Sequence, residues 1–205
     1  MQLSPLRYPG GKSRAVKILD KYIPEETQKI VSPFFGGGSF ENYLSLKGHE
    51  VRGYDFCLPL SDFWNAYINR KQDLFERMEK LSELILQPKY WDVDRKSDER
   101  LEQKDLYSTW SEIALNSEDS FERGLHYFAL NRCAFSGLTL IAGPMSTKWI
   151  NTKIGPKALS NLEKIPFQVK SVDYMSCFDS IEKHRDDFLY LDPPYIMETK
   201  DKEAI

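Results

Sequence analysis

Apolar residues in this chain follow two different spacings, and the change from one to the other marks the predicted elements. Short apolar runs predict strands at 29–31, 50–54, 167–173 and 188–191. Apolar residues spaced three and four apart predict helices between them. The first two helices carry Ala15, Val16, Ile18, Leu19 and Tyr22, with Ser13 as the expected N-cap, and then Phe40, Tyr43, Leu44 and Leu46.

The strand signals stop between 58 and 132, where the pattern is helical. Its apolar stripes are Leu74, Met78, Leu81, Leu84 and Ile85, and further on Phe121, Leu125 and Phe128. The strand–helix alternation resumes only near residue 167, and a short helix is expected around 177–183. We therefore predict an α/β protein with a mainly helical insertion, not two cofactor-binding domains.

A glycine loop separates the first predicted strand from its helix, in the stretch Pro33-Phe34-Phe35-Gly36-Gly37-Gly38. Asp55 ends the second strand nineteen positions after Gly36, where nucleotide-binding βαβ units place an acid for ribose hydroxyls. Glu41 stands where a dinucleotide fingerprint has its third glycine, which fits a cofactor without a pyrophosphate. The pattern therefore predicts an adenosine-type cofactor.

The last predicted strand, 188–191, reads as buried on both faces and runs directly into Asp192-Pro193-Pro194-Tyr195. The prolines have no N–H and fix the backbone, so the Asp192 carboxylate and the Pro193 carbonyl are held as acceptors at the strand end. Two such acceptors and an aromatic face suit an amino group on an aromatic ring.

The N-terminal turn Tyr8-Pro9-Gly10-Gly11-Lys12 is followed by Ser13, which suggests a phosphate loop. That motif needs a glycine where Leu6 stands, and a strand before it, so we reject it. The glycines still allow a ligand to approach the backbone, and Lys12 is placed to face a carboxylate.

Composition is that of a globular protein, with 41% hydrophobic residues and a net charge of −3. The apolar runs are too short for a membrane helix, and the N-terminus has no signal core, so we expect a cytoplasmic protein. The three cysteines and three histidines are scattered, which predicts neither a disulfide framework nor a metal site. Residues 124–170 hold six Lys or Arg against one acid, which allows a local basic face.

The stretch 131–153 carries side chains that suit contacts with bases and phosphates, and Gly143-Pro144 within it suggests a hairpin or extended loop. The candidate residues for such contacts are Asn131, Arg132, Ser136, Thr139, Trp149, Asn151 and Lys153.

Taken in order, the N-terminal Gly-Gly-Lys turn, the glycine loop, Asp55, Asn131-Arg132, Asp173 and the Asp-Pro-Pro-Tyr motif resemble the Dam-like, D12 class of adenine-N6 DNA methyltransferases. The resemblance implies a Rossmann-like doubly wound sheet that binds S-adenosylmethionine, formed by 1–57 and 166–205. It also implies a helical target-recognition insertion, 58–165, that contacts double-stranded DNA.

Carried over by motif, the resemblance assigns the candidate residues of 131–153 to DNA contact, and it assigns two further groups to the sheet domain. The cofactor-binding residues would be Tyr8, Gly10, Gly11, Lys12, Phe35, Gly36, Gly37, Gly38, Asp55, Asp173 and Asp192, with Lys12 near the cofactor carboxylate. The catalytic residues would be Asp192, Pro193, Pro194 and Tyr195, which hold a flipped adenine for direct methyl transfer without a metal.

Family members continue with further strands past this motif, whereas only 196–205 follow it here. We expect that another chain or fragment completes the sheet, that the chain is truncated, or that it is a reduced relative with little catalysis. Two other functions stay open: an RNA or protein-glutamine amino methyltransferase, and a catalytically inactive DNA-binding relative.

Overall fold

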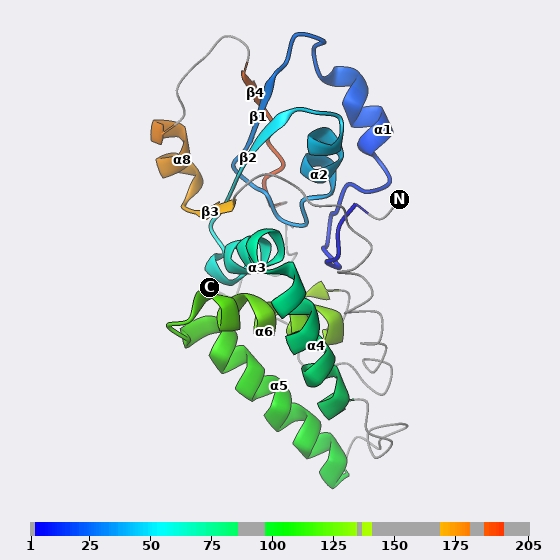
Figure 1. The fold of residues 1–205 in the computed structure, drawn as a ribbon, viewed down its shortest axis with the longest axis vertical. Helices are drawn as coiled ribbons and strands as arrows, with labels where there is room; N and C mark the ends of the chain where they lie inside the picture. The colour runs from blue at the N-terminus through cyan, green and yellow to red at the C-terminus, as the bar shows by residue number, and fades with distance from the viewer. Residues whose placement is uncertain (1–2, 86–96, 135–136, 141–168, 181–186, 195–205) are drawn as a thin grey trace, which may run out of the picture.

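The computed structural model describes residues 3–85, 97–134, 137–140, 169–180 and 187–194 (Figure 1). In chain order the elements are α1 (Val16–Leu19), the 3-10 turn η1 (Asp20–Tyr22), β1 (Lys29–Ser32), α2 (Ser39–Leu46), β2 (Glu50–Asp55), α3 (Leu58–Asn69), α4 (Lys71–Ile85), α5 (Asp98–Asn116), α6 (Ser120–Cys133), β3 (Val169–Ser171), α8 (Tyr174–Ser180) and β4 (Asp187–Leu189). The strand–helix alternation and the helical middle are therefore as predicted.

The four strands form one parallel sheet in the order β3-β2-β1-β4. Lys29 of β1 lies opposite Glu50 on one side and Asp187 on the other, and Gly53 of β2 lies opposite Val169. Because all strands run the same way, their carboxyl ends meet at one edge of the sheet, which is where parallel α/β sheets bind ligands.

Helices cover both faces of this sheet, with α2 on one side and α8 on the other (Figure 1). The main apolar cluster joins the α2 face to the helical half, with Ile30, Leu44 and Trp64 all fully buried. A smaller cluster of Val31, Tyr54 and Cys177 fills the space under α8. The helical insertion and the sheet therefore share one continuous core.

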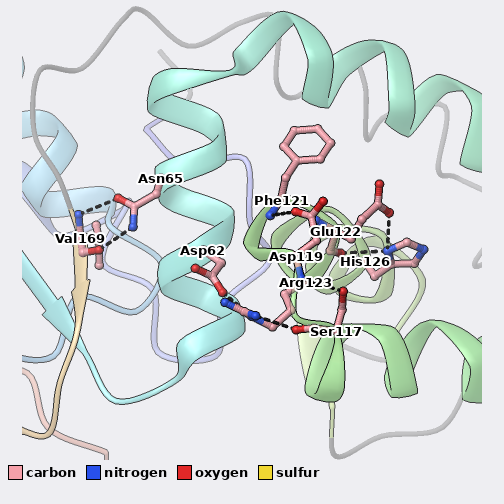
Figure 2. A network of polar contacts seen from close by, with 9 residues as sticks. All are labelled: Asp62, Asn65, Ser117, Asp119, Phe121, Glu122, Arg123, His126 and Val169. Carbon is pink, nitrogen blue, oxygen red and sulfur yellow. Dashed lines mark hydrogen bonds and ion pairs between the residues drawn. The ribbon is translucent and has the colours of Figure 1, made fainter.

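Helix α3 connects the two halves through side-chain hydrogen bonds (Figure 2). Asp62 accepts a 2.6 Å ion-paired hydrogen bond from Arg123 of α6. One turn further on, Asn65 donates to the carbonyl of Val169 at 2.8 Å and accepts from its N–H at 3.2 Å. The Asn65 amide thus acts as a substitute strand partner where the chain re-enters the sheet.

The first helix differs from the prediction. Helix α1 begins at Val16 with Ala15 as N-cap, and Ser13 instead donates to the Ser39 hydroxyl at 2.8 Å, at the start of α2. Ile18 is 60% and Tyr22 73% exposed, so the expected apolar stripe buries fully only Val16. A four-residue helix is too short to present a continuous apolar face.

The apolar stripes of the insertion are mostly core, as predicted. Leu74, Met78, Leu125 and Phe128 are fully buried, whereas Leu84 is 46% exposed near the end of α4.

The prediction that the last strand is buried on both faces is wrong. Phe188 and Tyr190 pack against the main core, and the Tyr190 ring meets Phe40 edge to face at 4.9 Å. Leu189 and Leu191 point the other way and are 40% and 50% exposed. Within the described residues β4 pairs with β1 alone, so a further chain or fragment that completes the sheet stays a prediction.

Candidate active site

The N-terminal turn lies against the glycine loop that follows β1. Gly11 N–H donates to the Tyr8 carbonyl at 3.0 Å, and Gly10 has the positive φ of 76° that closes such a turn. A Cβ built on Gly36 would lie 2.8 Å from the Tyr8 ring, and one on Gly37 would lie 2.7 Å from the Tyr8 Cβ. The two glycines therefore make room for Tyr8, which is 38% exposed and forms one wall of the site.

Phe35 supports the loop from below. Its side chain is 2% exposed and packs edge to face on Trp64 at 5.3 Å. Gly38 and Gly53 leave room for this ring, because a Cβ at either position would come within 2.5 Å of it. Phe35 was predicted among the cofactor-binding residues, and the structure places its ring in the core, so only its backbone remains available to a ligand.

Asp55 at the end of β2 holds the glycine loop by its backbone. One carboxylate oxygen accepts the Gly36 N–H at 2.8 Å and the other accepts the Cys57 N–H at 2.9 Å. Burial raises the pKa of Asp55, and these two hydrogen bonds oppose the rise. Each oxygen retains a lone pair for a further donor such as a ribose hydroxyl.

Lys12 and Asp192 form an ion pair, although they are 180 positions apart in the sequence. The Lys12 ammonium also donates to the Gly10 carbonyl at 2.9 Å, and both side chains are about three-quarters buried, with exposures of 23% and 24%. Lys12 was predicted to lie near the cofactor carboxylate, and in the structure its ammonium pairs with the carboxylate of Asp192. The pair joins the N-terminal turn to the end of β4.

The acids near the N-terminal turn also affect the pKa of the Tyr8 hydroxyl. Burial raises the pKa of its hydroxyl first, and the negative charges of Asp55, Cys57 and Asp192 raise it further. The phenol therefore stays protonated at neutral pH and can donate a hydrogen bond. Tyr8 rests on Gly36, which Asp55 holds, and Lys12 of the same turn pairs with Asp192, so both acids lie close to the N-terminal turn.

Glu41 is a buried acid near this site whose role the sequence did not reveal. It lies in the first turn of α2, is 3% exposed, and accepts a 2.7 Å hydrogen bond from the Ser32 hydroxyl. Burial raises the pKa of Glu41 to about 7, with the charge of Asp192 adding to the rise and Ser32 and Lys12 opposing it. The signal in the sequence was that Glu41 stands where a dinucleotide-binding fingerprint has its third glycine.

Asp173 follows β3 beside the Asp55 strand end, since the Val172 N–H donates to the Asp55 carbonyl at 3.1 Å. Its carboxylate caps α8 by accepting the Met175 and Ser176 N–H groups at 2.8 and 3.0 Å. The Ser176 hydroxyl also donates to it, and this hydrogen bond lowers the pKa of Asp173. Asp173 therefore lies at the edge of the sheet where the cofactor site is predicted, but its carboxylate already caps helix α8.

The motif predicted to be catalytic, which begins at Asp192, follows β4. The Tyr190 N–H donates to the Val31 carbonyl at 2.9 Å, which carries the ladder one residue past β4. Pro193 and Pro194 are exposed beyond Asp192. Tyr195, the predicted stacking residue, lies outside the described residues.

Three of the predicted DNA-contacting residues are buried in the helical half, so the expectation for them needs correction. Asn131 is 0%, Arg132 6% and Thr139 5% exposed. Asn131 and Arg132 end helix α6, and Arg132 donates to the Pro5 carbonyl at 3.1 Å. In this position none of the three can reach a base or a phosphate. Ser136, Trp149, Asn151 and Lys153 lie outside the described residues.

The donor set fits a nucleoside cofactor with a methionine group. Asp55 suits ribose hydroxyls, the Tyr8 ring suits apolar or stacked atoms, and Lys12 suits a carboxylate. Acids around the site also suit a positively charged centre.

None of the helices in the described part of the chain combines the length and apolar character that a bilayer crossing needs.

Comparison with known families agrees with the resemblance found in the sequence. The family model described as D12 class N6 adenine-specific DNA methyltransferase matches residues 8–203, from the N-terminal turn to beyond the Asp192 motif. No individual curated protein matches the chain significantly.

Proposed function

Because this chain belongs to the D12 class of N6 adenine-specific DNA methyltransferases, we propose that the edge formed by Tyr8, the glycine loop, Asp55 and Asp192 is where methyl transfer takes place. The family activity is S-adenosylmethionine-dependent methylation of adenine in DNA, which agrees with the resemblance found in the sequence. The RNA and protein-glutamine alternatives are not favoured by this match.

The observation that carries the proposal is the continuity of contacts across the sheet edge. Tyr8 rests on Gly36 and Gly37, and Lys12 of the same turn pairs with Asp192. The groups proposed for the cofactor and those proposed for the adenine therefore border one site, as direct transfer of a methyl group requires.

We assign the cofactor side to Tyr8, Gly10, Gly11, Lys12, the backbone of 35–38, Asp55 and Asp173. S-adenosylmethionine would supply a methyl group activated by its sulfonium. Asp55 would accept the ribose hydroxyls while its other lone pairs keep the glycine loop in place, as its bonds to Gly36 and Cys57 indicate.

On the adenine side, Asp192 and the Pro193 carbonyl would accept the two N–H bonds of the target amino group, and Tyr195 would stack on the ring. Holding the amino group in this way directs its lone pair toward the incoming methyl carbon. Once methylated, the amino group would lose its extra proton to Asp192 or to water, and the cofactor would leave as the neutral thioether. The Lys12 ammonium fixes the Asp192 carboxylate in position before substrate arrives.

The division of labour along the chain is also part of the proposal. The sheet with 1–57 and 166–205 would be the Rossmann-like doubly wound catalytic domain, and 58–165 the target-recognition insertion. The extension of α4 and α5 away from the sheet supports this division (Figure 1). Helix α3, at the start of the insertion, is hydrogen-bonded to Arg123 within the insertion and to Val169 of the sheet, so it links the two parts. Ser136, Trp149, Asn151 and Lys153 remain the candidates for contact with double-stranded DNA.

The test is incubation of the full chain with S-adenosylmethionine labelled in its methyl group and three acceptors: unmethylated duplex DNA, duplex RNA and a glutamine-containing protein. We expect label only in the DNA, and on N6 of adenine when the product is digested to nucleosides. Transfer to RNA or protein, or DNA binding with no transfer at saturating cofactor, would contradict the proposal.

A further inference from the structure

We infer that Asn131 is a positioning residue that sets the place of Tyr8 on the glycine loop through the backbone of Arg7. The inference rests on the proposed function, because it takes Tyr8 to line the cofactor site.

Asn131 pairs with both polar backbone groups of Arg7, 124 positions away in the sequence. Its Oδ1 accepts the Arg7 N–H at 2.9 Å, and its Nδ2 donates to the Arg7 carbonyl at 2.8 Å. The amide therefore does for Arg7 what a neighbouring strand would do. Such help matters here because residues 3–15 form no helix or strand of their own.

The position of Arg7 decides the position of Tyr8, because the two residues are consecutive. From Arg7 the chain enters the turn closed by Gly11, and the Tyr8 ring lands on Gly36 and Gly37. These contacts leave little tolerance, since a single added methyl group on either glycine would meet Tyr8. A shift of the Arg7 backbone would lift the ring from the loop.

The platform that carries Asn131 is rigid. The residue is completely buried in the last turn of α6, and its neighbours Leu130 and Cys133 are also fully buried. Its Nδ2 also lies 3.0 Å from the Thr139 hydroxyl and 3.4 Å from the Gly137 carbonyl. Gly137 packs so closely on Arg7 that a Cβ there would lie 1.9 Å from the Arg7 carbonyl oxygen. Arg7 is thus held from two sides.

The same contacts explain why the donor and acceptor atoms of the Asn131 side chain matter more than its volume. Asp at this position would keep the acceptor for the Arg7 N–H but would place a second oxygen against the Arg7 carbonyl. Asn131→Asp therefore breaks one half of the clamp while it leaves the size of the side chain unchanged.

The chain offers a matched control in Asn65, which clamps Val169 with the same two hydrogen bonds (Figure 2). Asn65→Asp makes the same chemical change in a different helix and leaves Arg7 and Tyr8 untouched. Comparison of the two variants separates the general cost of breaking such a pair of hydrogen bonds from an effect on cofactor binding that depends on the position of Tyr8.

The experiment is a double-mutant cycle on binding of S-adenosylhomocysteine, measured by calorimetry, with the melting temperature of each variant recorded. Asn131→Asp and Tyr8→Ala are each expected to weaken binding roughly tenfold, and the double variant no more than about twofold beyond Tyr8→Ala. Non-additivity of this kind is expected only if Asn131 acts through Tyr8. Asn65→Asp combined with Tyr8→Ala should give the product of the single effects.

An additive cycle for Asn131, or equal non-additivity for Asn65, would overturn the inference. If Asn131→Asp does not fold, Asn131→Ser repeats the cycle without introducing a charge. If both fail to fold while Asn65→Asp folds, the amide supports the whole chain and not Tyr8 in particular, which also overturns it. Failure of the unaltered protein to bind S-adenosylhomocysteine would instead contradict the proposed function.

Discussion

Asp55 and Gly36 are joined by a 2.8 Å hydrogen bond from the Gly36 N–H to the Asp55 carboxylate. The acid at the end of β2 therefore holds the loop at the end of β1, and the ligand role proposed for Asp55 is combined with a structural one. Any substitution of Asp55 tests both roles together unless the variant retains an acceptor oxygen.

For that reason we predict different results for two substitutions of Asp55. Asp55→Asn keeps one acceptor and should weaken S-adenosylmethionine binding about tenfold, because a charge-assisted hydrogen bond becomes a neutral one. It should also lower the melting temperature, because its NH2 group would face one of the two N–H groups that Asp55 accepts. Asp55→Ala should also cost about 1–3 kcal/mol of folding free energy, since two N–H groups lose their partner. Calorimetry and thermal unfolding measure the two effects.

The control for Asp55→Asn is Asp119→Asn. Asp119 accepts the Phe121 and Glu122 N–H groups at the start of α6, in the helical half (Figure 2). It removes the same charge at a site where one oxygen accepts both N–H groups, and it should leave cofactor binding within about twofold. An unchanged dissociation constant for Asp55→Asn would argue against the ribose assignment.

Asp192→Ala should abolish methyl transfer to DNA, with a fall of at least about a hundredfold in turnover, because the amino group loses its charged acceptor. Cofactor binding should change much less, since Tyr8 and Asp55 remain. The measurement is incorporation of labelled methyl groups into unmethylated duplex, beside the cofactor dissociation constant. Full activity of this variant would remove the proposed mechanism.

Glu41 should make stability depend on pH. Burial first of all raises its pKa from the ordinary 4.5 to about 7. Between these values the folded protein keeps a proton that the unfolded chain has lost, so this contribution to stability falls as pH rises from about 4.5 to 7. Glu41→Gln should therefore be more stable than the unaltered protein at pH 8, by on the order of 3 kcal/mol, and similar to it near pH 4.

The measurement for Glu41 is denaturant unfolding at several pH values, with Glu118→Gln as the control for loss of a carboxylate on the exposed turn before α6. A stability difference between Glu41→Gln and the unaltered protein that stays constant from pH 4 to pH 8 would contradict the assignment.

Arg123→Met should destabilise the fold by about 3 kcal/mol, because it leaves the buried Asp62 carboxylate without its counter-ion. Asp62 and Arg123 have side-chain exposures of only 11% and 15%. The paired change Asp62→Leu with Arg123→Met should recover most of this loss, since no charge then remains buried. Denaturant unfolding of the two single variants and the double variant measures the coupling, and equal losses for Arg123→Met and the double variant would contradict it.

Gly38→Ala should be far more damaging than Gly48→Ala. Both glycines have positive φ, 62° and 101°, which costs an alanine about 1 kcal/mol. At Gly38 the new Cβ would also lie 2.5 Å from the Phe35 ring and 2.9 Å from Trp64, whereas nothing lies within 4 Å at Gly48. We expect about 3 kcal/mol for Gly38→Ala by denaturant unfolding. Equal losses at both positions would mean that the loop is not tightly packed.

Local patterns predicted the parts of the fold that depend on neighbours in the sequence. The strand ending at Ser32, the helix from Ser39 and the strand ending at Asp55 are short-range features, because spacing and strand-end chemistry identify them. The glycine loop was predicted to admit a ligand, and its close contact proved to be with Tyr8. Periodicity contains no information about which distant side chain fills such a space.

The errors arose where a partner far away in the sequence decides the role of a residue. Asn131 has a residue type suited to bases, but its amide is used by Arg7, 124 positions earlier. Ser13 has a residue type suited to an N-cap, but its hydroxyl is used by Ser39. The pairing of Lys12 with Asp192 was equally invisible, although each residue had been singled out for its own motif.

The register between β1 and β4 has a consequence for how the protein is made. Lys29 lies beside Asp187, so the strand that carries Asp192 can join β1 only after the 158 positions that separate them (187 − 29) have been synthesised. The helices of the insertion form from local contacts and fold early, whereas pairing across such a long loop is slow. A nascent chain would therefore form the glycine loop and the end of β2 well before the Asp192 motif reaches the sheet, so the two halves of the proposed site would assemble at different times.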